Sequence, residues 1–161
     1  MVLIKTVVFT ILVPGTVTIL VPYWLLSSSS NPPSMGLGAF RYAGLLPISV
    51  GVATYLWCAW DFTFAGRGTP APIDPPRELV VRGLYRYVRN PMYVGVLLIL
   101  CGEVLLFGSW VLLEYTAIIF IFFFLFIMLY EEPTLKQKFG DSYDHYCLNV
   151  PRWLPFRMRR G

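Results

Sequence analysis

Four long apolar runs follow one another along the chain, and polar residues gather in two segments between and after them. The runs cover residues 7–26, 39–64, 91–107 and 110–130. A helix needs about 20 mostly apolar residues to cross the hydrocarbon core of a bilayer, so the pattern predicts about four transmembrane helices. We therefore expect an all-α integral membrane protein in which residues 1–161 form a single domain.

The third and fourth runs are joined only by Gly108 and Ser109. A link this short predicts a tight helical hairpin. Gly95 and Gly102 lie seven residues apart on one face of the third run, which indicates close packing against a neighbouring helix. A signal peptide is the alternative for the first run, but its length and the missing A-x-A-like cleavage site favour a retained span.

The two polar segments differ in character. Residues 66–90 form a linker rich in Pro and Gly, and residues 131–156 form a polar tail. The tail predicts one short helix over about residues 134–147 that is broken or ends near Gly140.

The distribution of positive charge along the chain predicts how the protein is oriented in the membrane. Only 14% of the residues are charged, against about 25% in soluble domains. Of the 13 Lys and Arg residues, most lie in the linker and the tail, so the positive-inside rule places the N-terminus, the linker and the C-terminus in the cytoplasm. The net charge of +4 then indicates topology and contact with anionic lipid headgroups, and not a nucleic-acid partner.

Several kinds of site find no support in the sequence. Cys58, Cys101 and Cys147 are spaced neither as a metal site nor as a disulfide framework. The chain also has no G-x-G-x-x-G after a strand, no Walker loop and no H-E-x-x-H. We expect no metal centre and no nucleotide-binding Rossmann site.

The expected hairpin places the start of the third span beside the end of the fourth. It would join Asn90–Pro91 to Glu131–Glu132 and form a polar pocket at the cytoplasmic mouth of two packed helices. The pocket would contain Tyr85, Arg89, Asn90, Tyr93, Glu131 and Glu132.

Each of these residues also has an ordinary structural interpretation. The arginines suit a cytoplasmic helix end, and the tyrosines suit an aromatic belt at the lipid surface. Pro91 suits the first position of a helix with Asn90 as its N-cap. Glu131 and Glu132 suit the first turn of a tail helix, although two acids at the end of so apolar a span are costly without partners.

Four short motifs occur in a fixed order around the hairpin. They read "RNPMY" at 89–93, "EEPTL" at 131–135, "FGDSYDHY" at 139–146 and "VPRWLPF" at 150–156, with "RELVVRGLY" at 77–85 leading in. Over roughly residues 77–156 the chain resembles the isoprenylcysteine carboxyl methyltransferase family in its small prokaryotic branch. It resembles the phospholipid N-methyltransferases more distantly.

The resemblance implies an integral methyltransferase of the prokaryotic cytoplasmic membrane that uses S-adenosylmethionine, held at the cytoplasmic end of the hairpin within segments 66–90 and 131–156. It implies Arg89, Glu131 and Glu132 as catalytic residues. The implied cofactor-binding residues are Arg77, Glu78, Leu79, Val80, Tyr85, Asn90, Pro91, Met92, Tyr93 and Glu131. The implied partners are the lipid bilayer and a lipophilic or amphiphilic methyl acceptor.

The chain departs from the family pattern at two points. Asn90 stands where the family has a histidine, and Asn149 stands where a basic residue precedes Val-Pro, although Arg152 follows. Both carboxylate O-methylation and lipid N- or O-methylation remain open, and only the second would need Glu131 or Glu132 as a base. The alternative function is a non-catalytic lipid-binding or assembly protein on the same scaffold.

Overall fold

The computed structural model describes residues 2–28, 34–64, 79 and 81–155, and within these residues the chain is helical. An isolated bridge between Ser34 and Ser109 is the β-type pairing found there. In chain order the elements are α1 (Val2–Leu12), the π turn η1 (Thr16–Leu20), α2 (Val21–Ser28), the 3₁₀ helix η2 (Gly38–Gly44), α3 (Leu45–Phe64), the 3₁₀ helix η3 (Gly83–Arg86), α4 (Pro91–Phe107), α5 (Trp110–Phe126), the π turn η4 (Ile127–Glu131), α6 (Glu132–Phe139) and α7 (Asp141–Asn149).

Three continuous helical stretches are long and apolar enough to cross a membrane. They cover Thr6–Ser28, Gly38–Thr63 and Trp110–Phe139. The third predicted span, residues 91–107, corresponds to α4, a shorter apolar helix of 17 residues. The all-α membrane fold is therefore confirmed at this coarser level, with three helices of spanning length in the described part of the chain.

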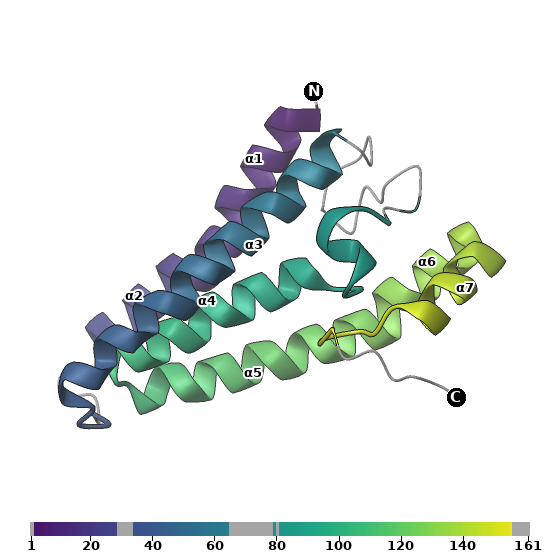
Figure 1. The fold of residues 1–161 in the computed structure, drawn as a ribbon. Helices are drawn as coiled ribbons and strands as arrows, with labels where there is room; N and C mark the ends of the chain where they lie inside the picture. The colour runs from purple at the N-terminus through teal and green to yellow at the C-terminus, as the bar shows by residue number, and fades with distance from the viewer. Residues whose placement is uncertain (1, 29–33, 65–78, 80, 156–161) are drawn as a thin grey trace.

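A close seam joins α3 to α4, because glycines on each helix face the backbone of the other. A Cβ built on Gly102 would lie 2.6 Å from the Gly44 carbonyl oxygen and 2.5 Å from Cγ1 of Ile48. A Cβ built on Gly95 would lie 3.0 Å from the carbonyl oxygen of Gly51. The predicted close packing of Gly95 and Gly102 is confirmed, and its partner is α3, which lies alongside α4 in Figure 1.

The link between α4 and α5 is as short as the sequence indicates. Gly108 adopts a left-handed conformation with φ of 58°, which glycine reaches without steric cost. Ser109 is the N-cap of α5, and its Oγ accepts a hydrogen bond of 3.4 Å from the Leu112 amide. The chain thus reverses at this point, and α4 and α5 run back alongside each other from the turn (Figure 1).

The helix of the fourth run does not end near Tyr130. It continues through η4 into α6 and ends at Phe139, so the tail helix begins earlier than the sequence predicts. Pro133 has no N–H to donate to the preceding turn, and the π turn just before it keeps the helix continuous. The helix break that the sequence predicts near Gly140 is present, because Gly140 has a φ of 54° and a separate helix, α7, follows it.

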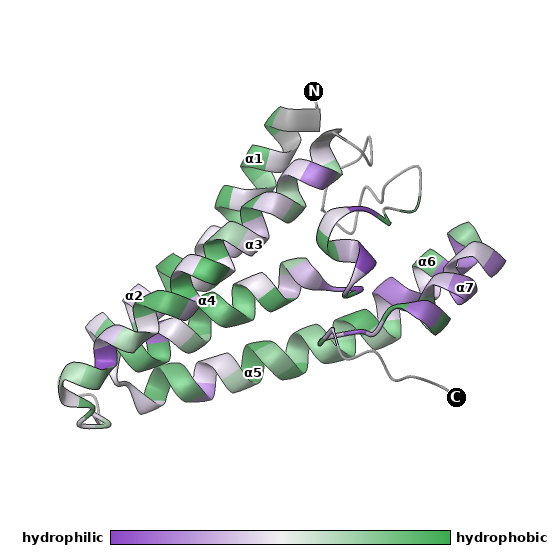
Figure 2. Ribbon diagram, in the orientation of Figure 1, coloured by the Kyte–Doolittle hydropathy of each residue, from purple (hydrophilic) through white to green (hydrophobic). Residues whose placement is uncertain are grey.

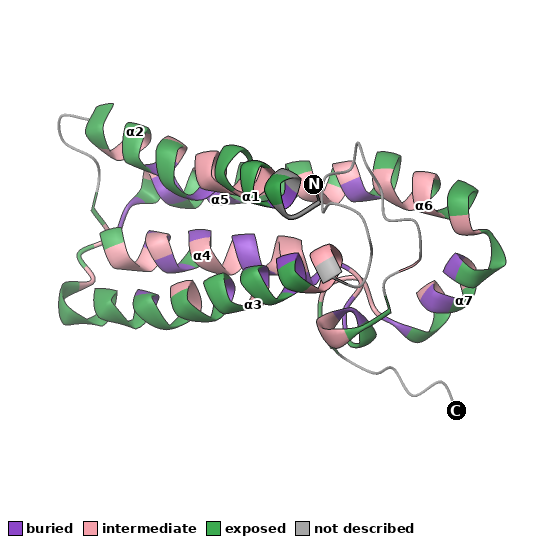
Figure 3. Cartoon of the chain, turned by 90° about the horizontal axis from the view of Figure 1, so that it is seen from above, coloured by how far each residue is buried: buried purple, intermediate pink, exposed green. Residues whose placement is uncertain are grey.

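Polar residues gather at one end of the molecule. Figure 2 shows mainly hydrophobic ribbon along α1 to α5 and hydrophilic residues around η3, α6 and α7. In Figure 3 much of α2 and α3 is exposed, while α4 contains several buried residues. Because large apolar side chains such as Leu46, Leu129 and Trp60 remain exposed, the lateral surface suits contact with lipid.

Candidate functional site

The polar end contains a set of paired side chains that we call the carboxylate cluster: Arg89, Tyr93, Glu131, Glu132 and Arg152. Arg89 lies two residues before the start of α4, and Tyr93 lies in the first turn of that helix. Glu131 ends η4, and Glu132 begins α6. The side chains of both acids therefore reach residues at the start of α4 from the end of the π turn.

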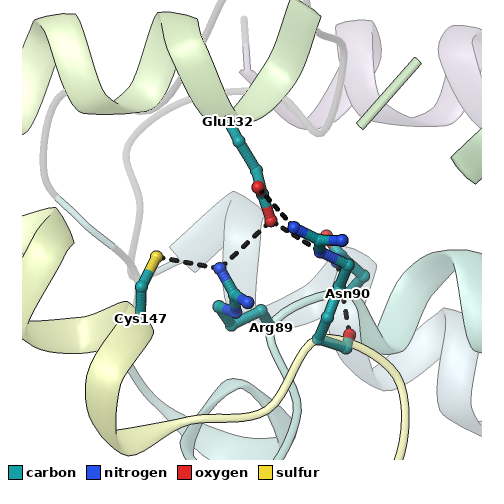
Figure 4. A network of polar contacts seen from close by, with 5 residues as sticks. Arg89, Asn90, Glu132 and Cys147 are labelled. Carbon is teal, nitrogen blue, oxygen red and sulfur yellow. Dashed lines mark hydrogen bonds and ion pairs between the residues drawn. The ribbon is translucent and has the colours of Figure 1, made fainter. Parts of the chain in front are cut away.

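Glu132 accepts hydrogen bonds from two arginines. Nη1 of Arg89 lies 3.0 Å from Oε1, while Nε and Nη2 of Arg152 lie 2.9 Å from Oε1 and 2.8 Å from Oε2. The side chains of Arg89 and Glu132 are only 14% and 20% exposed, so this ion-paired triad is largely withdrawn from water. Figure 4 shows the guanidinium of Arg89 directed at Glu132 on one side and at Cys147 on the other.

Glu131 has a different partner. The Tyr93 hydroxyl donates a hydrogen bond of 2.5 Å to Oε2 of Glu131, and the Tyr93 ring meets Phe123 edge-on with centroids 4.8 Å apart. The aromatic contact holds the phenol in place, and the phenol orients the carboxylate. The two adjacent acids thus have distinct environments, one bound by cations and one by a neutral donor.

The chain after α7 returns to the start of α4. The Arg89 amide donates to the Pro151 carbonyl at 2.9 Å, and Nδ2 of Asn90 donates to the Arg152 carbonyl at 3.3 Å. Asn90 does occupy the N-cap position before Pro91, as predicted, but its side chain makes no capping bond. It instead fixes the segment that carries Arg152 (Figure 4).

Aromatic side chains of η3 and α7 support the cluster at the polar end of the molecule. The Tyr146 hydroxyl donates to the Tyr85 carbonyl at 2.7 Å, and Tyr143, Tyr146 and Val150 form a small buried core. Burial raises the pKa of the Tyr85 phenol and also that of the Tyr146 phenol above the usual range. Both groups are therefore neutral donors at physiological pH.

Other residues implicated by the sequence lie outside the cluster. The Tyr85 ring packs against Cys58 and Phe62 of α3, and Leu79 packs against the Tyr143–Tyr146 core. Pro91 is the buried first residue of α4, and Met92 packs against both cores that involve α3. Arg77, Glu78 and Val80 lie outside the described residues.

Sequence reasoning did not assign Arg152 or Cys147 to the site. Arg152 makes two of the three contacts to Glu132, and Cys147 accepts a hydrogen bond from Arg89 at 2.8 Å. The one available signal was the position of Arg152 directly after Val-Pro, because that turn directs the chain back toward the helices.

The cluster has unused hydrogen-bonding capacity. Among the described residues, the buried Nε of Arg89 has no partner, and Glu131 accepts a hydrogen bond from Tyr93 although a carboxylate can accept several. No group of three or more potential metal ligands occurs in the described part of the chain. The arrangement thus suits a ligand that carries both an acceptor for arginine and a donor for a carboxylate.

Comparison with known proteins adds independent findings. A model of the family described as phospholipid methyltransferase matches residues 40–142. The protein-S-isoprenylcysteine O-methyltransferase of Schizosaccharomyces pombe is 38% identical over 77 residues, which cover 48% of this chain and 33% of that protein. The protein-S-isoprenylcysteine O-methyltransferase B of Arabidopsis thaliana is 36% identical over 97 residues, which cover 57% of this chain and 49% of that protein. A probable protein-S-isoprenylcysteine O-methyltransferase of Oryza sativa subsp. indica is 36% identical over 84 residues. The chain thus spans half or less of the length of these relatives.

Proposed function

The chain belongs to the phospholipid methyltransferase family, and from that premise we propose that it is a membrane methyltransferase that uses S-adenosylmethionine to methylate an amphiphilic acceptor. The observation that carries the proposal is the carboxylate cluster, because all of its residues except Arg152 lie within the stretch 40–142 that the family model matches. It joins the two polar segments where apolar helices meet an aqueous boundary.

The residues of the cluster fit the methyl donor chemically. S-adenosylmethionine supplies an electrophilic methyl group on a sulfonium, together with an ammonium, a carboxylate and ribose hydroxyls. Nε of Arg89, which is buried without a partner in the described part of the chain, can donate to a carboxylate oxygen. Glu131 has free lone pairs for an ammonium or a hydroxyl, and Tyr93 holds that carboxylate in position.

The pairing of both acids favours a carboxylate as the acceptor. Glu132 is held by two guanidinium groups and Glu131 by a phenol. A carboxylate acceptor is already deprotonated and needs no base, whereas an amine or alcohol requires one. The role of the protein is then to bring donor and acceptor into line and to exclude water. The names of the relatives, which specify O-methylation of isoprenylcysteine, agree with this choice.

We further propose that α4 is a fourth span and that the cluster is cytoplasmic. The excess of Lys and Arg in the linker and the tail supports that orientation. An amphiphile would then approach the cluster from the inner leaflet, with its tail in lipid and its head at the start of α4.

The test combines binding and transfer in lipid nanodiscs. Calorimetric titration of the purified protein with S-adenosylhomocysteine should give saturable binding that Glu131→Ala abolishes. Transfer of a labelled methyl group should occur to N-acetyl-S-farnesylcysteine and not to phosphatidylethanolamine. The matched control is Glu114→Ala, an exposed acid at the other end of α5.

The outcomes separate the alternatives. Binding with transfer only to phosphatidylethanolamine would overturn the carboxylate assignment but keep the methyltransferase. A folded wild type that binds no S-adenosylhomocysteine and transfers no methyl group would favour a non-catalytic lipid-binding or assembly protein.

A further inference from the structure

The segment after α7, which contains Pro151, Arg152 and Trp153, contacts both α4 and α5. Its Pro151 and Arg152 carbonyls are bound by the start of α4. Trp153, the next residue, packs on α5, with its ring centroid 5.7 Å from that of Phe120. The segment therefore contacts both the start of α4 and the middle of α5.

Trp153 extends well into the apolar layer. Phe120 precedes Glu131 by 11 residues, which corresponds to roughly 16 Å along a helix. Phe120 also neighbours Phe124, with centroids 6.5 Å apart, so the indole lies beside a phenylalanine-rich part of α5. Arg152 and Trp153 thus reach different parts of this helical stretch, since Arg152 contacts Glu132 and Trp153 contacts Phe120.

The indole N–H of Trp153 has no partner in these surroundings. Nε1 is buried and unpaired among the described residues. Water does not satisfy such a donor at this depth, and a buried donor without an acceptor destabilises the protein. Nε of Arg89, on the residue whose amide holds Pro151, is also buried and unpaired. Both buried groups that lack a partner beside this segment, as far as the structure describes the chain, are donors, so a matching partner is an acceptor.

We propose that the Trp153 N–H binds an oxygen of the acceptor's head group and so selects amphiphiles that carry an oxygen next to the chain, such as a carboxylate or carbonyl. This inference rests on the proposed function. The ligand enters between α4 and α5, the Phe120 ring shifts, and the oxygen replaces the missing partner. Trp153 is then a specificity-determining residue and takes no part in methyl transfer itself.

The test uses Trp153→Phe, which retains an aromatic ring against Phe120 and removes only the N–H. Titrations in nanodiscs use three probes: N-acetyl-S-farnesylcysteine, farnesyl ethyl thioether, which has the tail but no oxygen, and S-adenosylhomocysteine. We expect the variant to bind the first probe about tenfold more weakly, as for loss of a hydrogen bond to a charged acceptor. Binding of the thioether and of S-adenosylhomocysteine should be unchanged.

Two further variants control for packing. Trp110→Phe removes an indole from an exposed position at the start of α5 and should alter none of the three affinities. Phe120→Leu removes the ring contact but keeps the N–H, so any loss should be equal for the two farnesyl probes.

The probes also identify the source of the oxygen. Weaker binding of S-adenosylhomocysteine alone would assign the N–H to the methyl donor and overturn the inference. Equal binding of N-acetyl-S-farnesylcysteine by wild type and Trp153→Phe, or no binding by a wild type that does bind S-adenosylhomocysteine, would also overturn it. Loss of S-adenosylhomocysteine binding by the wild type would instead count against the proposed function.

Discussion

The helix α4 takes part in two contacts of opposite kind. Along its length, the seam with α3 brings backbones together because Gly44, Gly51, Gly95 and Gly102 have no side chains to separate them. At its start, the carboxylate cluster holds α4 to α6 and to the C-terminal segment through charged side chains. The seam leaves no room for change, whereas the cluster has spare hydrogen-bonding groups. The rigid packing thus lies along the length of α4, whereas the groups that could bind a ligand lie at its start.

The largest expected effect is on the cluster, from Glu132→Ala. The change leaves Arg89 and Arg152 partly buried without their shared carboxylate, and loss of one partner of a buried ion pair costs about 3 kcal/mol. Thermal unfolding in nanodiscs should show the loss. The control Asp144→Ala breaks an exposed pair with Lys136 and should cost less than about 1 kcal/mol. Equal losses would mean that burial does not distinguish the two pairs.

The apolar pattern predicted the frame of the fold better than it predicted the cluster. The helix start at Pro91 and the turn at Gly108–Ser109 depend on local backbone chemistry, so sequence alone locates them. The proximity of Arg89 to Glu132 follows from that turn. Which acid pairs with which donor depends on the π turn, and the position of Arg152 depends on how the chain returns after α7. Neither the π turn nor the return of the chain after α7 produces a periodic pattern of apolar residues in the sequence.

The seam should respond to Gly102→Val with the next largest effect. The added carbon atoms would meet the Gly44 carbonyl oxygen and the Ile48 side chain, and overpacking of this kind costs about 2 kcal/mol. Unfolding measurements would detect the loss, while S-adenosylhomocysteine affinity of the folded fraction should stay unchanged. Gly15→Ala is the control, because a Cβ at Gly15 would meet the Thr10 carbonyl oxygen at 3.5 Å, an ordinary contact distance. A Gly102→Val protein with normal stability would contradict the tight seam.

Tyr93→Phe should have a smaller effect, and on binding more than on folding. It removes the hydroxyl that orients Glu131 and keeps the ring against Phe123. We expect about tenfold weaker binding of S-adenosylhomocysteine, the scale of one hydrogen bond to a charged group. Tyr130→Phe, at a half-exposed position on the same helical stretch, should leave affinity unchanged. Wild-type affinity in Tyr93→Phe would remove Tyr93 from the binding site.

The smallest expected effect concerns Tyr146, which supports the cluster. Burial raises the pKa of its phenol in the folded protein above the unfolded value of 10.0. Its contribution is therefore complete below about pH 10 and is lost as pH rises further. At pH 8, Tyr146→Phe should cost about 1 kcal/mol through the lost bond to the Tyr85 carbonyl. Unfolding scans should show this difference shrink above pH 10. A constant difference would refute the assignment, and the exposed Tyr87→Phe is the control.

The unbroken helical stretch from Trp110 to Phe139 fixes the distance between the Ser109 turn and the two acids. Its 30 residues correspond to about 45 Å, while the hydrocarbon core measures about 30 Å. Glu131 comes 22 residues after Ser109, which corresponds to about 33 Å along a helix and is close to the thickness of that core. Because the distance is fixed in a continuous rod, a thicker bilayer draws the acids toward the acyl chains and a thinner one exposes them. The acyl chain length of the lipids therefore affects how far the two acids lie from the head group of the acceptor.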